Sequence, residues 1–260
     1  MRHNVALCVF CFALLPQFVT SAFAVDFAQD TTGRNKWHTT NISIHLDVSL
    51  LANETLAIRE ALTLMSAQTC LRFRENDTEQ YRITFSRAPP AYGRICKAGL
   101  GQSSWNNVFG FWLCYSQPGR ILHELMHLLG FLHEHERPDR DHHIEILWEK
   151  IDQRAHGYFR KARPVSAVTT MGTPYDVYSV MHYEPWIQSP RYTNGERVIM
   201  MRPLDSSVDF NRIGQKQRLS DGDVEAINKM YCAEANSNVY GGEADHHNLF
   251  HQHENGQILR

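Results

Sequence analysis

The stretch from His123 to His133, HELMHLLGFLH, is the feature that most constrains this chain. His123 and His127 are four residues apart, so on a helix both imidazoles project from one face, one turn apart. Gly130 can adopt a positive φ angle and end the helix, after which the chain turns back. His133 then supplies a third nitrogen from outside the helix. Three protein ligands and one open position are typical of a catalytic zinc site. We therefore predict one Zn²⁺ per chain.

Glu124 lies beside the first histidine of this pattern. Its carboxylate cannot easily bind the same ion, but it can reach a water molecule on that ion. Zinc lowers the pKa of such a water towards about 7. Glu124 can then accept the proton and later transfer it to a leaving amine. The natural electrophile for this chemistry is a peptide carbonyl, so the expected substrate is a protein or peptide.

The first 24 residues predict a secretory signal. Arg2 and His3 give a basic start, an apolar run follows from Val5 to Leu15, and Ala22 to Ala24 fits a small-x-small cleavage site. The run is too short to span a bilayer, which needs about 20 apolar residues, and no later segment approaches that length. We therefore expect a secreted protein with no membrane span; a buried N-terminal helix is the alternative.

Cysteine content agrees with export. Four cysteines remain after the signal, and in an oxidising compartment an even number predicts two disulfides with three possible pairings. They are Cys70, Cys96, Cys114 and Cys232. Glycosylation sequons begin at Asn41, Asn53 and Asn76.

The charge balance excludes some partners. The chain has 26 Lys and Arg against 28 Asp and Glu, a net charge of -2, which gives no electrostatic footprint for nucleic acid or an anionic membrane. The 15 histidines are in excess and point instead to metal chemistry. The composition does not predict an oligomeric state.

Hydrophobic periodicity predicts a mixed α and β organisation, with a sheet backed by a helix. A strand is expected over 41–50, with one apolar face made of Ile42, Ile44, Leu46, Val48 and Leu50. Helices are expected over 55–69 and 121–129, and strands over 71–74 and 81–85. Residues 86–119 are expected to form loops and irregular strands.

The C-terminal part of the chain divides into a helix and a tail. Ser220 followed by Asp223 resembles a capping box that opens a helix with Val224, Ile227 and Met230 inward. After Cys232 the sequence is polar and His-rich with no periodicity, which predicts a disordered tail over 233–260. A second metal site in this tail is the less favoured interpretation.

Two long motifs resemble the astacin family of zinc metalloproteases, within the metzincin clan. His123 to Asp141, HELMHLLGFLHEHERPDRD, is similar to the astacin zinc motif. Thr173 to Tyr183, TPYDVYSVMHY, is similar to the astacin Met-turn. Shorter similarities occur at 70–73 and 213–220, and the resemblance extends over about 37–232.

The resemblance implies roles for individual residues. His123, His127 and His133 would bind zinc, and Glu124 would be the general base. Met181 would form an apolar floor under the ligands. Tyr183 would be a further zinc ligand at rest and would swing away to stabilise the oxyanion when substrate binds, a role that suits a phenol donor.

It also implies an α+β fold of two lobes. The lobe before Gly130 would contain a twisted sheet and the zinc helix, and the lobe after it would be less regular. The catalytic domain would extend over 35–232. The disulfides would pair Cys70 with Cys232 and Cys96 with Cys114.

Family members are usually zymogens in which a propeptide aspartate occupies the metal. Residues 27–30, FAQD, resemble that motif, so Asp30 would be the switch in a short propeptide over 25–34. Cleavage after Arg34 would leave Asn35 as the first residue. Astacins bury the new N-terminus near the residue that corresponds to Glu134. A chain that begins at Asn35 has only two residues before Trp37, which is fewer than the family usually has there. A mature chain that begins at Val25 is the alternative.

Two other functions compete with that of a secreted zinc endopeptidase. One is a catalytically silent astacin-like binding protein that uses the cleft for docking. The other is a metal-buffering protein built on the histidine excess.

Overall fold

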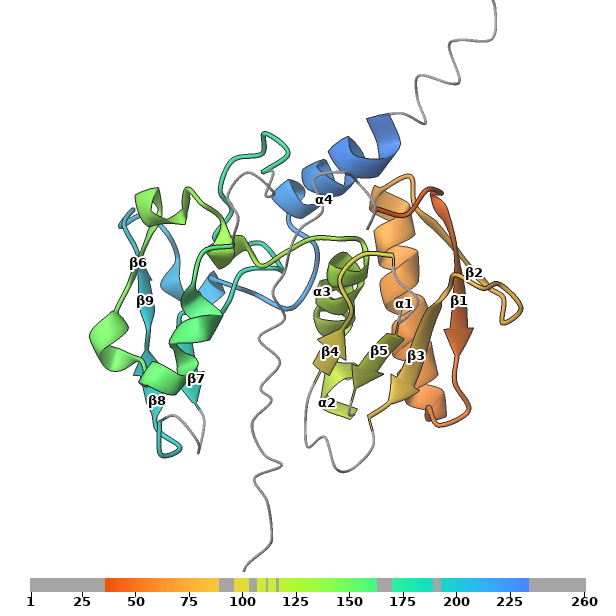
Figure 1. The fold of residues 1–260 in the computed structure, drawn as a ribbon, viewed down its shortest axis with the longest axis horizontal. Helices are drawn as coiled ribbons and strands as arrows, with labels where there is room; N and C mark the ends of the chain where they lie inside the picture. Colours follow the sequence, from red (N-terminus) through yellow and green to blue (C-terminus); the bar gives the residue numbers. More distant parts are fainter. Residues whose placement is uncertain are drawn as a thin grey trace, which may run out of the picture.

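The computed structural model describes residues 36–88, 96–102, 107–110, 112–115, 117–162, 170–188 and 193–233. The predicted signal, the predicted propeptide with Asp30 and Arg34, and the tail after residue 233 lie outside these residues. Figure 1 shows two lobes side by side, one built on a sheet with helices and the other on two small two-stranded sheets and short helical turns. The α+β class predicted from the sequence is confirmed.

The first lobe contains one five-stranded sheet with strand order β2-β1-β3-β5-β4 (Figure 1). The first four of these pair in parallel, and only β4 is antiparallel, against β5. The strands are β1 Asn41–Leu46, β2 Arg72–Glu75, β3 Ile83–Arg87, β4 Cys96–Ala98 and β5 Asn107–Gly110. The helices are α1 Ala52–Gln68, α2 Trp112–Tyr115 and α3 Pro118–Leu128.

Helix α1 covers the sheet through one apolar stripe. Ile58, Ala61, Leu62 and Met65 are all buried in the core of the first lobe, as their spacing predicts. Glu54, in the first turn, is also buried; its carboxylate accepts a hydrogen bond at 2.8 Å from the backbone N–H of Leu51. The helix start is therefore fixed by a side chain that reaches back to the chain before it.

The predicted strand over 41–50 is wrong beyond Leu46. Val48 is 98% exposed, although the alternation places it on the buried face. The reason is a turn in which the side chain of Asp47 accepts a hydrogen bond from the N–H of Ser49 at 2.8 Å, while Leu50 donates to the Asp47 carbonyl at 3.0 Å. Leu50 still packs against the core, from beyond the turn.

The second lobe has its own small core, which includes Ile144, Phe159 and Met201. Two antiparallel pairs, β6 with β9 and β7 with β8, form its sheets. The strands are β6 Ile144–Ile146, β7 Trp186–Gln188, β8 Arg197–Ile199 and β9 Met201–Pro203. The 3₁₀ helices are η2 Glu134–Glu136, η3 Arg140–His142, η4 Trp148–Lys150, η5 Gln153–Phe159 and η7 Phe210–Arg212.

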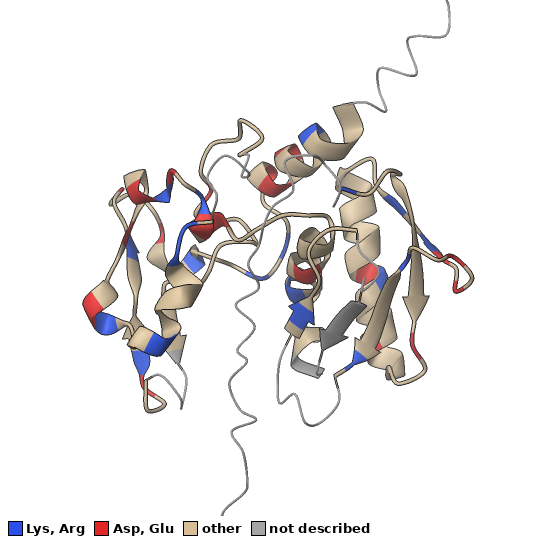
Figure 2. Cartoon of the chain, in the orientation of Figure 1, with Lys and Arg blue, Asp and Glu red and all other residues tan. Residues whose placement is uncertain are grey.

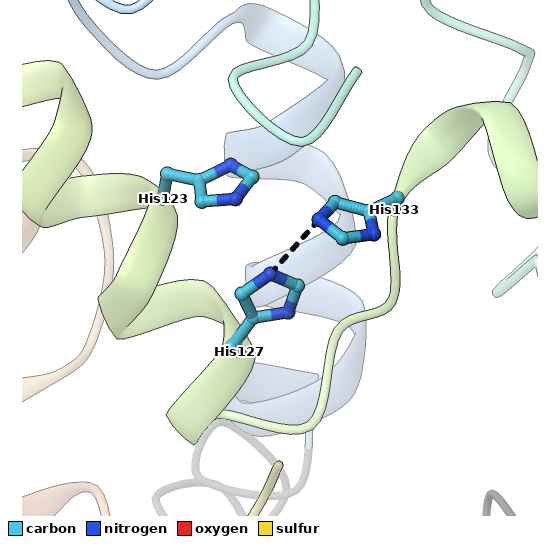
Figure 3. A group of neighbouring side chains, drawn as sticks. All are labelled: His123, His127 and His133. Atoms are coloured by element: carbon cyan, nitrogen blue, oxygen red, sulfur yellow. Dashed lines mark hydrogen bonds between the residues drawn. The ribbon is translucent and has the colours of Figure 1, made fainter. Parts of the chain in front are cut away.

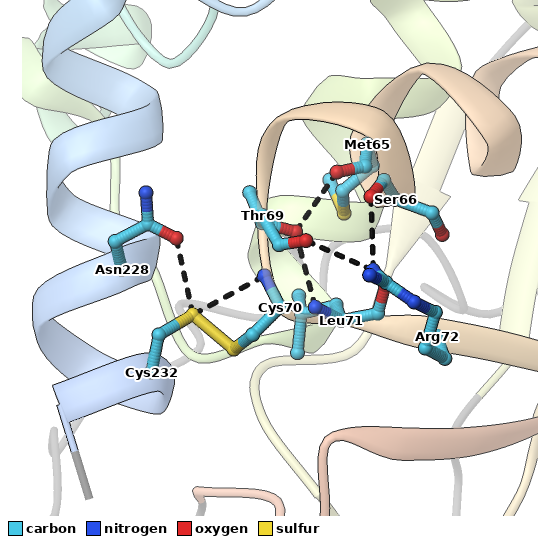
Figure 4. Close-up of a disulfide and its surroundings, with 8 residues drawn as sticks. All are labelled: Met65, Ser66, Thr69, Cys70, Leu71, Arg72, Asn228 and Cys232. Atoms are coloured by element: carbon cyan, nitrogen blue, oxygen red, sulfur yellow. Dashed lines mark hydrogen bonds between the residues drawn. A yellow bond between two sulfur atoms is a disulfide. The ribbon is translucent and has the colours of Figure 1, made fainter. Parts of the chain in front are cut away.

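The last described part of the chain returns to the first lobe through α4 Asp221–Ile227 and the π-helical turn η8 Asn228–Cys232. Ser220 caps α4 by accepting a hydrogen bond from the N–H of Asp223 at 3.0 Å, which confirms the predicted capping box. Cys232 is bonded to Cys70 beside the end of α1 (Figure 4). Cys96 is bonded to Cys114. Both pairings are those that the family resemblance implies.

Charged residues of both signs are interspersed over the two lobes (Figure 2). Within the described ranges, no helix has the length and apolar character needed to cross a bilayer.

Candidate metal centre

Helix α3 carries the first two histidines, and it ends where the sequence predicts. Gly130 has a φ of 97°, in the left-handed region that glycine tolerates. Its N–H donates to the His127 carbonyl at 2.8 Å, and the N–H of Phe131 donates to the Met126 carbonyl at 3.0 Å. This pair of bonds is a Schellman motif, which satisfies the last carbonyls of the helix. The chain then reverses and brings His133 back towards α3.

The three predicted histidines converge on one point (Figure 3). One potential ligand atom from each of His123, His127 and His133 lies within 4.8 Å of the other two. The Nε2 atoms of His127 and His133 are 3.2 Å apart. Among the residues that the structure describes, this is the one cluster of three such groups.

Each imidazole is oriented by a hydrogen bond on its outer nitrogen. The Nδ1 of His123 lies 2.8 Å from the carbonyl oxygen of Val180, and the Nδ1 of His127 lies 2.8 Å from that of Phe131. The Nδ1 of His133 lies 3.0 Å from a carboxylate oxygen of Glu136. All three partners are acceptors, so Nδ1 carries the proton and each Nε2 lone pair faces the shared point.

This arrangement fits a zinc ion. Two nitrogens at about 2.0–2.1 Å from a tetrahedral ion are about 3.3 Å apart, close to the separation of the two Nε2 atoms. Burial, followed by the mutual repulsion of the rings, lowers the pKa of His127 to about 3 and holds that of His123 well below its usual range. Burial also lowers the pKa of His133 to about 3. The neutral imidazoles that a metal requires are therefore already present.

Glu124 is 6% exposed and follows His123 on α3. Burial raises the pKa of its carboxyl to about 7, and the Lys216 ammonium and the backbone N–H of Ala98 partly oppose that increase. A carboxyl with a pKa near neutrality can both accept and return a proton. Ala98 belongs to β4, the edge strand of the sheet. The side chain of Glu124 therefore extends from α3, which we call the metal helix, towards this edge strand.

The segment over 173–183, which contains Met181 and Tyr183, contacts the histidines. Met181 is buried in the core of the first lobe, and its carbonyl accepts a hydrogen bond from the N–H of Glu134 at 3.1 Å. The ring of Tyr183 lies 4.5 Å from that of His133 and stacks at 4.0 Å on that of His135. Burial raises the pKa of Tyr183, so its phenol is a hydrogen-bond donor at neutral pH.

Glu134 lies beside the metal centre and not in it. Its carboxylate accepts hydrogen bonds from the N–H of Asp176 at 2.9 Å and from Arg137 at 3.0 Å. Burial raises the pKa of Glu134 to about 7. A small cavity borders this carboxylate together with Asp176 and Asp223.

Sequence reasoning missed several residues that surround the site. Lys216 donates three hydrogen bonds to backbone carbonyls near His123, and burial lowers the pKa of its ammonium to about 8. His135 and His182 are both fully buried. His135 and His182 lie within the two long motifs, and Lys216 lies within the shorter similarity at 213–220. Their spacing in the sequence does not predict a role for any of them.

Comparison with known proteins gives consistent results. A family model described as Astacin, a peptidase family, matches residues 29–232. Zinc metalloproteinase nas-30 of Caenorhabditis elegans is 35% identical over 175 residues, which cover 67% of this chain and 22% of the relative. Astacin-like metalloendopeptidase of Coturnix japonica is 37% identical over 187 residues, which cover 72% of this chain and 42% of the relative. The chain thus spans less than half of either relative.

A solved structure extends the similarity to the fold. High choriolytic enzyme 1, a hatching enzyme zinc-protease from Oryzias latipes, superposes with a TM-score of 0.62 at 27% identity. The match covers 76% of this chain and 92% of that chain.

Proposed function

Because this chain belongs to the astacin family of zinc metallopeptidases, we propose that it is a zinc-dependent endopeptidase that hydrolyses peptide bonds in proteins. The observation that carries the proposal is the convergence of three neutral imidazoles, each with its Nδ1 held from outside, beside a buried glutamate. The names of the relatives describe zinc metalloproteinases, which supports the same reaction class.

His123, His127 and His133 would hold the ion through Nε2. When bound, zinc supplies Lewis-acid polarisation of a carbonyl and activates water as a nucleophile. Glu124 accepts a proton from the attacking water and returns it to the amine that leaves. The phenol of Tyr183 donates a hydrogen bond to the oxygen on which negative charge develops. Its ring stands beside His133, which supports this placement.

The substrate class follows from the sheet edge next to the site. Strand β4 pairs with β5 on one side, and in the described part of the chain no strand pairs with its other side. An extended peptide can align its backbone with such an edge. Because Ala98 of β4 also faces Glu124, a peptide aligned there would have its backbone close to the general base.

The test of this function is the substitution Glu124→Gln, with Glu124→Ala beside it. We expect both variants to retain one zinc per chain by metal analysis and to lose cleavage of a denatured protein by about 10²–10⁴-fold, the usual contribution of a general base. Glu60→Gln, on the exposed face of α1, is the matched control and should cleave as the unsubstituted protein does.

The outcomes separate the competing functions. Unchanged cleavage by the Glu124 variants would exclude Glu124 as the base. A protein that binds one zinc but cleaves nothing would favour the silent binding protein instead. Metal binding by the histidine tail alone, with the site histidines replaced, would favour metal buffering.

Secretion belongs to the same proposal, as does activation from a zymogen. The signal over 1–24, the two disulfides and the sequons support export. Mass spectrometry of the secreted form reads its first residue directly. A start at Asn35 is expected if Asp30 is the switch of a propeptide, and a start at Val25 would contradict the zymogen.

A further inference from the structure

Residues 214–216 are wedged between the metal helix and the backbone that carries Tyr183. Gly214 has a φ of +64°, and a Cβ there would lie 2.5 Å from the backbone carbonyl carbon of Tyr183. On the opposite side, a Cβ on Gly119 in the first turn of α3 would lie 2.2 Å from the carbonyl carbon of Lys216. Two glycines thus allow the segment over 214–216 to pack against the backbone of Tyr183 and against the first turn of α3 at the same time.

The ammonium of Lys216 is surrounded by backbone carbonyl groups. It donates hydrogen bonds to the carbonyl oxygens of Val180 at 2.7 Å, His182 at 2.8 Å and Gly214 at 3.0 Å. An ammonium has three donors, so its hydrogen-bonding capacity is filled. All three acceptors are backbone groups.

Two of these carbonyls bear directly on the metal centre. The oxygen of Val180 is also the partner of the His123 Nδ1, at 2.8 Å. The carbonyl of His182 belongs to the peptide bond that leads into Tyr183. One cation therefore holds both the carbonyl that His123 contacts and the peptide bond that precedes Tyr183.

We propose that Lys216 is a positioning residue for the metal centre, which keeps His123 and Tyr183 in the mutual arrangement that the ion requires. The inference rests on the proposed zinc site. A lysine that served stability alone would not need to share an acceptor with a metal ligand, and it carries the desolvation cost of a buried charge. Replacing a hydrogen-bond partner of a metal ligand typically changes metal affinity 10–100-fold, and Lys216 acts on such a partner, the Val180 carbonyl.

The experiment compares Lys216→Met with Lys229→Met. The methionine removes all three donors and retains most of the side-chain length. Lys229 is a matched control because it also donates to a backbone carbonyl, that of Gly172 at 3.1 Å, and pairs with Glu225, but outside the site. Zinc affinity is measured by competition with a chelator. The Cu²⁺-substituted protein is then examined for the phenolate-to-copper absorption band, which reports contact between Tyr183 and the metal.

We expect Lys216→Met to bind zinc at least tenfold more weakly and to lose or shift the copper band. Lys229→Met should match the unsubstituted protein in both. Unchanged zinc affinity and an unchanged copper band in Lys216→Met would overturn the inference. This also holds if Lys216→Met lowers the unfolding temperature of the metal-free protein, because Lys216 would then serve stability alone. If Lys216→Met does not fold, Lys216→Gln is measured in the same way, and unchanged values in it would overturn the inference.

The two proposals fail differently. An unsubstituted protein that does not bind zinc would overturn the proposed function and this inference together. Zinc binding that is indifferent to Lys216 would overturn the inference alone. A copper protein without the band before any substitution would overturn the part that concerns Tyr183.

Discussion

The carboxylate of Asp223 accepts a hydrogen bond from the backbone N–H of Val180 at 2.9 Å, across 43 residues of sequence. The carbonyl of the same Val180 is the partner of His123 and of Lys216. Both polar backbone groups of Val180 are therefore held, one by the cap of α4 and the other from within the metal centre. Helix α4 thus contributes to the site although it carries none of the proposed ligands.

Replacing Asp223 with Asn should destabilise the protein. Its Oδ1 accepts from the Ser179 hydroxyl, and its Oδ2 accepts from the N–H groups of Val180 and Ser220. An amide would give these buried groups a neutral partner in place of a charged one and would turn its NH2 towards the Ser179 hydroxyl, so the charge-assisted hydrogen bonds would be lost. We expect a loss of about 2–4 kcal/mol in the free energy of unfolding, measured in urea with zinc present. Asp221→Asn, exposed at the start of the same helix, should cost less than about 1 kcal/mol. Equal losses would refute the role of Asp223.

Replacing Gly214 with Ala should cost more than the same change at Gly157. At Gly214 the backbone has a φ of +64° and the new Cβ would meet the Tyr183 backbone, whereas nothing lies within 4 Å of a Cβ at Gly157. We expect a loss of at least about 2 kcal/mol at Gly214 and a change within about 1 kcal/mol at Gly157. Thermal unfolding of both variants checks this, and similar midpoints would contradict it.

The two disulfides should differ in their contribution to stability. Cys70 and Cys232 are 162 residues apart, whereas Cys96 and Cys114 are 18 apart. Loop-closure entropy gives about 5 kcal/mol for the longer loop and about 3 kcal/mol for the shorter one. Replacing each pair with alanines and measuring unfolding under oxidising conditions should reproduce that order. The reverse order would show that loop length does not decide it.

The metal-free protein should lose stability as the pH falls below about 6.5. Burial lowers the pKa of His127 and His133 to about 3 and that of His182 to about 4. Between those values and about 6.5, the unfolded chain binds protons that the folded chain excludes, so acid favours unfolding. Burial raises the pKa of Glu124 and Glu134 to about 7, so these carboxyls oppose part of the slope. They are outnumbered by the buried histidines, because burial also holds the pKa of His123 and His135 well below the usual range. Above about 6.5 these histidines are neutral in both states and add no slope.

Urea unfolding of the metal-free protein between pH 4.5 and 7.5 measures this slope. His182→Gln keeps an acceptor for the Tyr175 hydroxyl and a donor for the Tyr183 carbonyl, and it removes one titrating group. Each such proton contributes about 1.4 kcal/mol per pH unit, so the slope should decrease by up to that amount. An unchanged slope would show that His182 does not contribute.

Features with a local cause were predictable from the sequence. The metal helix follows from apolar spacing, its end follows from Gly130, and the start of α4 follows from the Ser220 and Asp223 pair. Each depends on residues within a few positions of one another. The disulfide pairing was not predictable in this way, because four cysteines allow three pairings and only the family resemblance selects among them.

Features that depend on backbone groups far away in sequence were not predictable. Lys216 finds its partners among carbonyls, which every residue carries, so no residue type marks them in advance. The three-residue strands β4 and β6 to β9 are too short to show a period. Val48 was wrongly placed because the side chain of Asp47 turns the chain before the alternation ends.

Both ends of the described domain converge on the last turn of the metal helix. The indole N–H of Trp37 donates to the Leu128 carbonyl at 2.8 Å, and the hydroxyl of Tyr231 donates to the Leu129 carbonyl at 2.7 Å. The backbone N–H of Trp37 also donates to that hydroxyl at 3.4 Å. A short peptide that joined residue 36 to residue 233 would therefore close the domain into a ring, and new termini opened in the exposed turn at Val48 would give a circular permutant with its metal centre intact.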